Sequence, residues 1–78
     1  MTTSEGLDGK LGRVTGTVRP GHIGEVMLAV GNRLEAYYAL PYDGAEMIDR
    51  GVECVVVATH PQLSRTVLVT AMPATDTD

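Results

Sequence analysis

The sequence predicts a small all-β domain that folds as a five-stranded barrel. Its apolar residues recur with a period of two, whereas an amphipathic helix has a period of about 3.6. Turn-forming Gly, Pro and Asn residues separate the apolar runs, and the connections between runs are short. Because a chain of 78 residues rarely divides into two independent cores, we expect one domain.

The alternating pattern places five strands in order along the chain. Their expected ranges are 12–19, 24–30, 33–40, 52–59 and 64–72. Pro20-Gly21 ends the first strand, because Pro cannot donate to a strand ladder. Gly31-Asn32 is expected to form a two-residue hairpin turn, since both residues tolerate positive φ. Between the third and fourth strands, residues 45–48 provide only enough chain for a short helical turn.

Alternation also assigns side chains to an inner and an outer face of each strand. The expected inward apolar residues are Val14 and Val18 on the first strand and Val26, Leu28 and Val30 on the second. On the third strand the expected inward residues are Leu34, Ala36, Tyr38 and Leu40. Tyr37 is then expected to point outward. On the fourth strand Cys54 has the same parity as Val56, so we expect a buried structural cysteine and not a reactive thiol.

Three glycines, Gly12, Gly16 and Gly24, lie inside or at the ends of expected strands. Glycine weakens an ordinary strand, so these placements indicate bulges or the tight bends at which a small barrel turns a corner. We therefore expect a strongly coiled, OB-like barrel. The usual helix of that fold, between the third and fourth strands, would be reduced to the turn at 45–48.

The charge distribution separates a neutral body from acidic ends. The net charge is −4, yet residues 10–70 contain six basic and six acidic side chains. The surplus acids lie in two segments, 1–10 and 73–78, whose composition predicts flexible tails on either side of a domain at 11–72. A neutral body lacks the basic stripe that nucleic-acid binding or a membrane surface normally requires.

The sequence also contains no apolar run of the roughly 18 residues that a membrane-spanning helix needs. No signal peptide is recognisable at its start, and its one cysteine cannot form an internal disulfide. We therefore expect a soluble, cytoplasmic domain.

The glycine, proline and valine spacing resembles a known family. Gly12-x-x-x-Gly16, Arg19-Pro20-Gly21 and Gly24-Glu25-Val26, together with Ile48, Gly51 and an alternating strand at Cys54 and Val56, are similar to the C-terminal soluble domain of NfeD-like proteins. The resemblance covers residues 11–69, which is nearly all of the expected barrel.

This resemblance implies an OB-fold barrel with no enzymatic site of its own. Domains of this family usually follow membrane helices, and longer members carry a serine-protease domain; this sequence contains neither. The family is linked to membrane-scaffold proteins of the stomatin, prohibitin and flotillin type, which the resemblance suggests as partners. The chain would then lie at the membrane periphery through such a partner.

No catalytic, cofactor or metal motif stands out from the sequence. His22, His60 and Cys54 lack the close pairing that tetrahedral zinc sites use. The carboxylates of Asp43, Glu46 and Asp49 do not have the spacing of a calcium loop. Neither of the two serines, at positions 4 and 64, lies in a nucleophile elbow. We expect a protein that is not an enzyme and has no cofactor.

The most informative irregularity is an apolar outer face. Outward positions should be polar, yet several are apolar on the second, fourth and fifth strands, which favours a protein-contact surface that serves self-association or a partner. The candidate interaction residues are Met27, Tyr37, Val55, Val57 and Leu68. The alternative is an OB-fold that binds single-stranded nucleic acid by stacking bases on Tyr37 and Tyr42.

Overall fold

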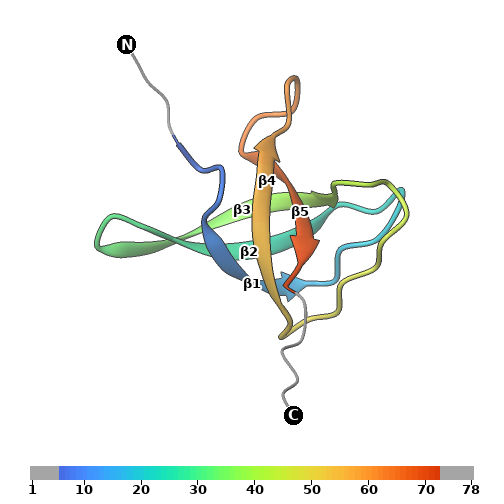
Figure 1. Cartoon of the computed structure of the whole chain (residues 1–78), viewed down its shortest axis with the longest axis horizontal. Helices are drawn as coiled ribbons and strands as arrows, with labels where there is room; N and C mark the ends of the chain where they lie inside the picture. The colour runs from blue at the N-terminus through green and yellow to red at the C-terminus, as the bar shows by residue number, and fades with distance from the viewer. Residues whose placement is uncertain (1–5, 73–78) are drawn as a thin grey trace.

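The computed structural model describes residues 6–72, which form one closed barrel of five strands (Figure 1). The strands follow the order β1-β2-β3-β5-β4 around the barrel. Their bounds are β1 Leu11–Gly16, β2 Gly24–Val30, β3 Arg33–Pro41, β4 Glu53–Thr59 and β5 Thr66–Ala71. Neighbouring strands are antiparallel except β3 and β5, which are parallel. The predicted five-stranded barrel is confirmed.

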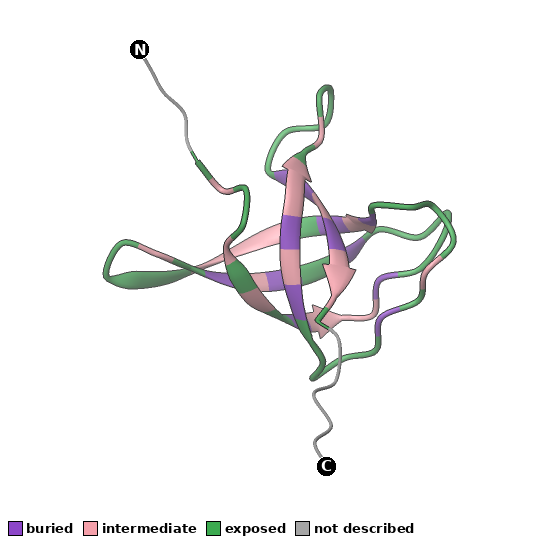
Figure 2. Ribbon diagram, viewed as in Figure 1, coloured by how far each residue is buried: buried purple, intermediate pink, exposed green. Residues whose placement is uncertain are grey.

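Seven of the ten buried apolar residues of the core are β-branched Val or Ile side chains. With no Phe or Trp in the chain, its largest fully buried members are Leu28 and Ile48. Figure 2 shows the buried positions alternating with partly exposed ones along the strands. The buried apolar residues are Val14, Val18, Val26, Leu28, Ala39, Ile48, Cys54, Val56, Val67 and Val69. Alternation therefore predicted the inner faces of β1, β2 and β4 correctly.

The inner face of β3 is the opposite of the one that the sequence predicted. Tyr37 packs against the core and Ala39 is buried, whereas Tyr38 is 56% exposed and Leu34 is 68% exposed. The reason is the register of the β2–β3 hairpin. The two-residue turn pairs Val30 with Arg33, so each inward residue of β2 faces an odd-numbered residue of β3.

The far half of this hairpin extends beyond the barrel. In Figure 1 the green ribbon around residues 29–35 projects away from the other strands as an arm. Gly31 forms the turn with a φ of 63°, a conformation that favours glycine. The arm thus places the end of β2 and the start of β3 where β4 and β5 do not cover them.

The connection between β3 and β4 contains no helix, which corrects the expected helical turn at 45–48. Asp43 organises its first part, because its carboxylate accepts hydrogen bonds from the backbone N–H groups of Ala45 and Glu46, both at 2.9 Å. These bonds lower the pKa of Asp43 below its ordinary value. Ile48 then pairs with Val18 through two backbone hydrogen bonds of 2.7 and 2.9 Å.

Glu46 ties the middle of the same connection to β5. Its carboxylate accepts a 2.8 Å hydrogen bond from the Thr70 hydroxyl and a 3.1 Å bond from the backbone N–H of Ala71. An extended segment with a buried Ile48 side chain therefore closes this end of the barrel, and the helix of the general OB fold is not needed for that purpose.

Gly16 and Gly24 lie where the chain turns from β1 into β2, as their positions in the sequence predicted, whereas Gly12 pairs regularly with Leu28 of β2 and Cys54 of β4 and marks no bend. The β1–β2 register shifts between Val14 and Gly16, which marks an irregularity at the end of β1. Gly24 starts β2 directly under the chain that leaves β1, and its Cα hydrogens face the carbonyl oxygens of Gly16 and Thr17. Close approach of the two backbones is possible only because position 24 has no side chain.

The first strand begins at Leu11, and residues just before it also contact the barrel. Leu7 packs against the core. The N–H of Gly9 donates to the carbonyl of Val56 at 2.7 Å, and the N–H of Val56 donates to the carbonyl of Lys10 at 2.9 Å. These bonds attach residues 7–10 to β4. The remainder of the two expected tails, 1–5 and 73–78, lies outside the described residues. In the segment 6–72 no helix is long and apolar enough to cross a membrane.

Candidate interaction surface

The five predicted interaction residues do not form one surface. Met27, Val55 and Leu68 lie on the outer face, where Met27 pairs with Ala36 and Val55 with Thr70. Val57 lies at the irregularity between Val56 and Ala58. All five side chains are at most partly exposed. Leu68 belongs to β5, which pairs with β3 and β4, so it lies on another side of the barrel from Met27.

Tyr37 is inward, which contradicts its predicted role as an exposed contact. Its ring packs on the core, and the guanidinium of Arg65 covers it at 4.4 Å from the ring centroid. Arg65 also donates a 2.6 Å hydrogen bond to the carbonyl of Ala36 and lies 3.8 Å from the carboxylate of Glu35. Tyr37 therefore belongs to the closure of the barrel between β3 and β5.

A contiguous apolar strip does exist on the outer face of β3, β2, β1 and β4. Leu34 pairs with Ala29, and Leu11 pairs with Val55. Gly12 pairs with Leu28, so the same antiparallel register brings Leu11 next to Ala29 and joins the two pairs. We call this surface the outer strip; its residues are Leu11, Met27, Ala29, Leu34 and Val55. Two of these, Leu11 and Leu34, are 57% and 68% exposed.

Charged residues border the outer strip on the side of the barrel body. Arg13 lies between Met27 and Glu53 in the strand pairing, and its guanidinium is 3.6 Å from the Glu53 carboxylate. It also donates a 3.0 Å hydrogen bond to the carbonyl of Gly51. Apolar side chains rimmed by polar ones are typical of protein–protein contact sites.

A separate groove runs beside the β1–β2 connection. It has a volume of about 380 Å³ and is lined by Gly16, Thr17, His22, Ile23, Gly24, Glu25 and Tyr38. OB folds bind ligands at the corresponding position, between the first connection and the faces of the second and third strands. Tyr38 is therefore the tyrosine at this site, in place of the predicted Tyr37. The carboxylate of Glu25 in the same groove disfavours a nucleic-acid phosphate.

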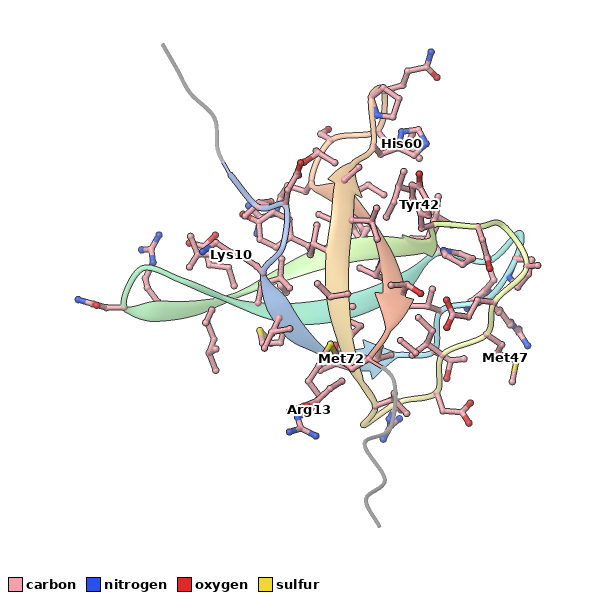
Figure 3. All side chains as sticks on the ribbon, viewed as in Figure 1. Lys10, Arg13, Tyr42, Met47, His60 and Met72 are labelled. Carbon is pink, nitrogen blue, oxygen red and sulfur yellow. The ribbon has the colours of Figure 1, made fainter. Side chains whose placement is uncertain are left out.

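Tyr42, the other predicted stacking residue, is 56% exposed but lies elsewhere. Figure 3 shows Tyr42 near His60, at the opposite end of the barrel from Arg13. The two exposed tyrosines thus belong to different parts of the surface, and Tyr42 does not line the groove at Tyr38.

Comparison with known proteins places the barrel in a family. The family model for the NfeD C-terminal domain matches residues 11–70, which is most of the chain and nearly all of the barrel. The chain belongs to the NfeD C-terminal domain family. The resemblance seen in the glycine, proline and valine spacing is thus confirmed.

A solved structure supports the same assignment of this NfeD C-terminal domain. The solution structure of the soluble domain of the NfeD protein YuaF from Bacillus subtilis is 26% identical, with a TM-score of 0.69. The match covers 83% of this chain and 73% of that chain. A search of curated proteins finds no match.

The candidate metal and catalytic residues of this NfeD C-terminal domain lie apart from one another. Within residues 6–72 no three His, Cys, Asp or Glu side chains gather as a metal site. His60 uses its Nδ1 atom to accept hydrogen bonds from the backbone N–H groups of Gln62 and Leu63, both at 3.1 Å. That nitrogen stabilises the β4–β5 connection.

Cys54 is fully buried, as the strand parity predicted. Burial raises the pKa of its thiol to about 11, and the neighbouring carboxylate of Glu53 adds to the effect. The thiolate is the reactive form of cysteine, so this side chain is held in its unreactive form at neutral pH.

We expect the folded domain to resist thiol-labelling reagents. At pH 8 the native protein should react at least about 100-fold more slowly than the protein unfolded in guanidinium, because the thiol is both buried and protonated. A colorimetric thiol assay with and without denaturant measures the two rates. Burial of the protonated Cys54 thiol also contributes to the free energy of unfolding. This contribution should be complete below pH 9 and should be lost as the pH rises through about 11, where the thiol ionises. Rapid labelling of the native protein at pH 8 would contradict the buried position.

Proposed function

We propose that this domain is a non-enzymatic protein-interaction module that binds other proteins through the outer strip. The observation that carries the proposal is the continuity of apolar side chains across four strands, from the exposed Leu34, Ala29 and Leu11 to the partly exposed Val55. Transfer of such side chains out of water on binding gives about 25 cal/mol per Å² of apolar area. The nearby Arg13–Glu53 pair would form a polar rim.

The binding partner in this proposal is either a further copy of the chain or a membrane-scaffold protein of the stomatin, prohibitin or flotillin type. The family assignment supports the second choice, since the resemblance to NfeD-like proteins implies such partners. Binding to a scaffold protein would keep the domain on the cytoplasmic side, peripheral to the membrane.

The positions of the candidate nucleophile and base support the non-enzymatic part of the proposal. The Cys54 thiol is buried and has a raised pKa, whereas an activated thiol needs exposure and a cationic neighbour. One nitrogen of His60 is already engaged with two backbone groups. The Cys54 thiol is therefore not arranged to attack a substrate.

Replacing Leu11 with aspartate tests the proposal. Leu11→Asp should fold normally, because the side chain is largely exposed, but it should weaken binding at least about tenfold by placing a charge in the centre of the outer strip. Calorimetry with the purified soluble part of a scaffold-type protein, and light scattering for self-association, measure the two forms of binding. Circular dichroism confirms the fold of the variant.

Leu63→Asp is the matched control. Leu63 is also an exposed leucine, at 44%, but it lies in the β4–β5 connection, outside the outer strip. The proposal requires that Leu63→Asp binds like the unmodified chain. If both variants bind normally, the outer strip is not the interface. Salt-dependent binding of short oligonucleotides that is lost in Tyr38→Ala would instead support the nucleic-acid alternative.

A further inference from the structure

One edge of β3 is open over the first half of the strand. On one side, β3 pairs with β2 from Arg33 to Ala39. On the other side, β5 pairs with β3 only from Tyr38 onward. In the part of the chain that the structure describes, no strand pairs with this second edge over residues 33–37. The open edge belongs to the hairpin arm that projects from the barrel (Figure 1).

The backbone groups that face this open edge can be assigned. The N–H of Tyr38 points toward β5, because it donates to the carbonyl of Arg65 at 2.8 Å. Hydrogen-bonding direction alternates along a strand, so the N–H and C=O groups of Leu34 and Ala36 point the same way. Arg65 occupies the Ala36 carbonyl with its guanidinium. The Arg65 side chain therefore blocks the edge at Ala36, whereas the N–H and C=O groups of Leu34 are available to a further strand.

We propose that a second copy of this chain pairs with β3 along this edge, antiparallel and with Leu34 on the two-fold axis. The inference deepens the proposed interaction function, on which it rests, by naming the partner and the contact. The two Leu34 residues would exchange N–H to C=O hydrogen bonds. Arg33 of each copy would then lie opposite Glu35 of the second copy.

Charge complementarity selects this register over its neighbour. Centred on Leu34, the pairing places Arg33 against Glu35 twice, once on each side of the axis. Centred on Glu35, it would place two Glu35 carboxylates opposite each other, which is destabilising. That register would also place Leu34 opposite Ala36, whose carbonyl already accepts a hydrogen bond from Arg65. In the favoured register, both copies of Leu34 extend one outer strip across the assembly.

Charge reversal at the two ends of this pairing provides the first test. Sedimentation equilibrium over a wide concentration range should show a monomer–dimer equilibrium for the unmodified chain. Arg33→Glu should raise the dissociation constant about tenfold, because it creates two like-charge pairs across the axis. The double change Arg33→Glu with Glu35→Arg should restore the constant to within about threefold, since the opposite charges face each other again.

Leu34→Pro provides an independent test at the centre of the edge. Proline removes the N–H that would donate to the second copy, and it is tolerated on edge strands because no bond within the chain is lost. The variant should be monomeric with an unchanged circular dichroism spectrum. If Leu34→Pro fails to fold, the charge-reversal series alone decides.

The outcomes separate this inference from the proposed function. Dimerisation that survives Arg33→Glu and Leu34→Pro but is lost in Leu11→Asp would overturn edge pairing, while the outer strip would stand as the interface. A monomer at all concentrations that still binds a scaffold-type protein would also overturn edge pairing alone. A chain that neither dimerises nor binds such a protein would overturn both. Loss of dimer in Arg33→Glu with recovery in the double variant supports the pairing.

Discussion

Replacing Gly24 with alanine is expected to destabilise the barrel by about 3 kcal/mol. A Cβ atom at this position would lie 2.5 Å from the carbonyl oxygens of both Gly16 and Thr17 and 2.8 Å from a methyl group of Val18. Two of these three neighbours are backbone atoms, so the clash cannot be relieved by a side-chain rotation. The loss is large for a small domain, because domains of this size are only marginally stable.

Gly16→Ala is the control for this experiment. Its added Cβ would approach Glu25 at 3.4 Å, which is ordinary van der Waals contact, although Gly16 lies on the other side of the same bend. Urea denaturation followed by circular dichroism measures both changes. We expect the midpoint of Gly24→Ala to fall much further than that of Gly16→Ala. Equal midpoints would show that the first connection relaxes away from β2 and that its close packing is not required.

Replacing Ile48 with alanine is expected to cost about 3 kcal/mol, within the range for large-to-small changes in a core. Ile48 is 1% exposed and is one of the two largest fully buried side chains. It also fixes the β3–β4 connection to Val18 through two backbone bonds. The truncation would therefore leave a cavity at the end of the barrel where this extended segment forms the closure.

The adjacent residue supplies a matched control. Met47 is 59% exposed and projects from the same connection, as Figure 3 shows. Met47→Ala should change the free energy of unfolding by less than about 0.5 kcal/mol, as surface substitutions usually do. Thermal unfolding of the two variants gives the comparison. Similar losses in both would mean that the connection is not anchored by the Ile48 side chain.

Much of the barrel could be predicted from the sequence because its strands are short and alternate strictly. Val14 and Val18, Val26 and Leu28, and Cys54 and Val56 are all buried in the parity that the pattern gave. The hairpin turn at Gly31-Asn32 was also recognisable from its residue types. These features depend on residues that are close together in the sequence, so they can be predicted without knowing which strands pair.

The predicted inner face of β3 was wrong, although the turn residues that determine the correct face are visible in the sequence. The even-numbered face that includes Leu34 is entirely apolar, whereas the opposite face contains Arg33 and Glu35, so hydrophobicity favoured the wrong face. The adjacent turn does decide, since a two-residue hairpin sets Val26 opposite Tyr37. Applying the turn geometry before the hydrophobic pattern would have identified the inward residues.

The outer strip was only partly predictable, because it depends on strand order. Met27 and Val55 were recognised from their parity, but Leu11 and Leu34 were not, since one lay at the edge of the expected tail and the other was assigned to the core. Their proximity results from β1 lying between β2 and β4. Pairing between segments so distant in the chain is not specified by local pattern.

The position of β5 between β3 and β4 has a consequence for synthesis of the chain. Of the five described strands, β5 leaves the ribosome last, and it closes the barrel by joining β3 and β4, which do not pair with each other. Until it emerges, the nascent polypeptide has β3 and β4 edges exposed together with the valines that Val67 and Val69 later cover. Folding of this domain is therefore expected to be completed only after translation of the final strand, and premature termination before Thr66 should yield an aggregation-prone product.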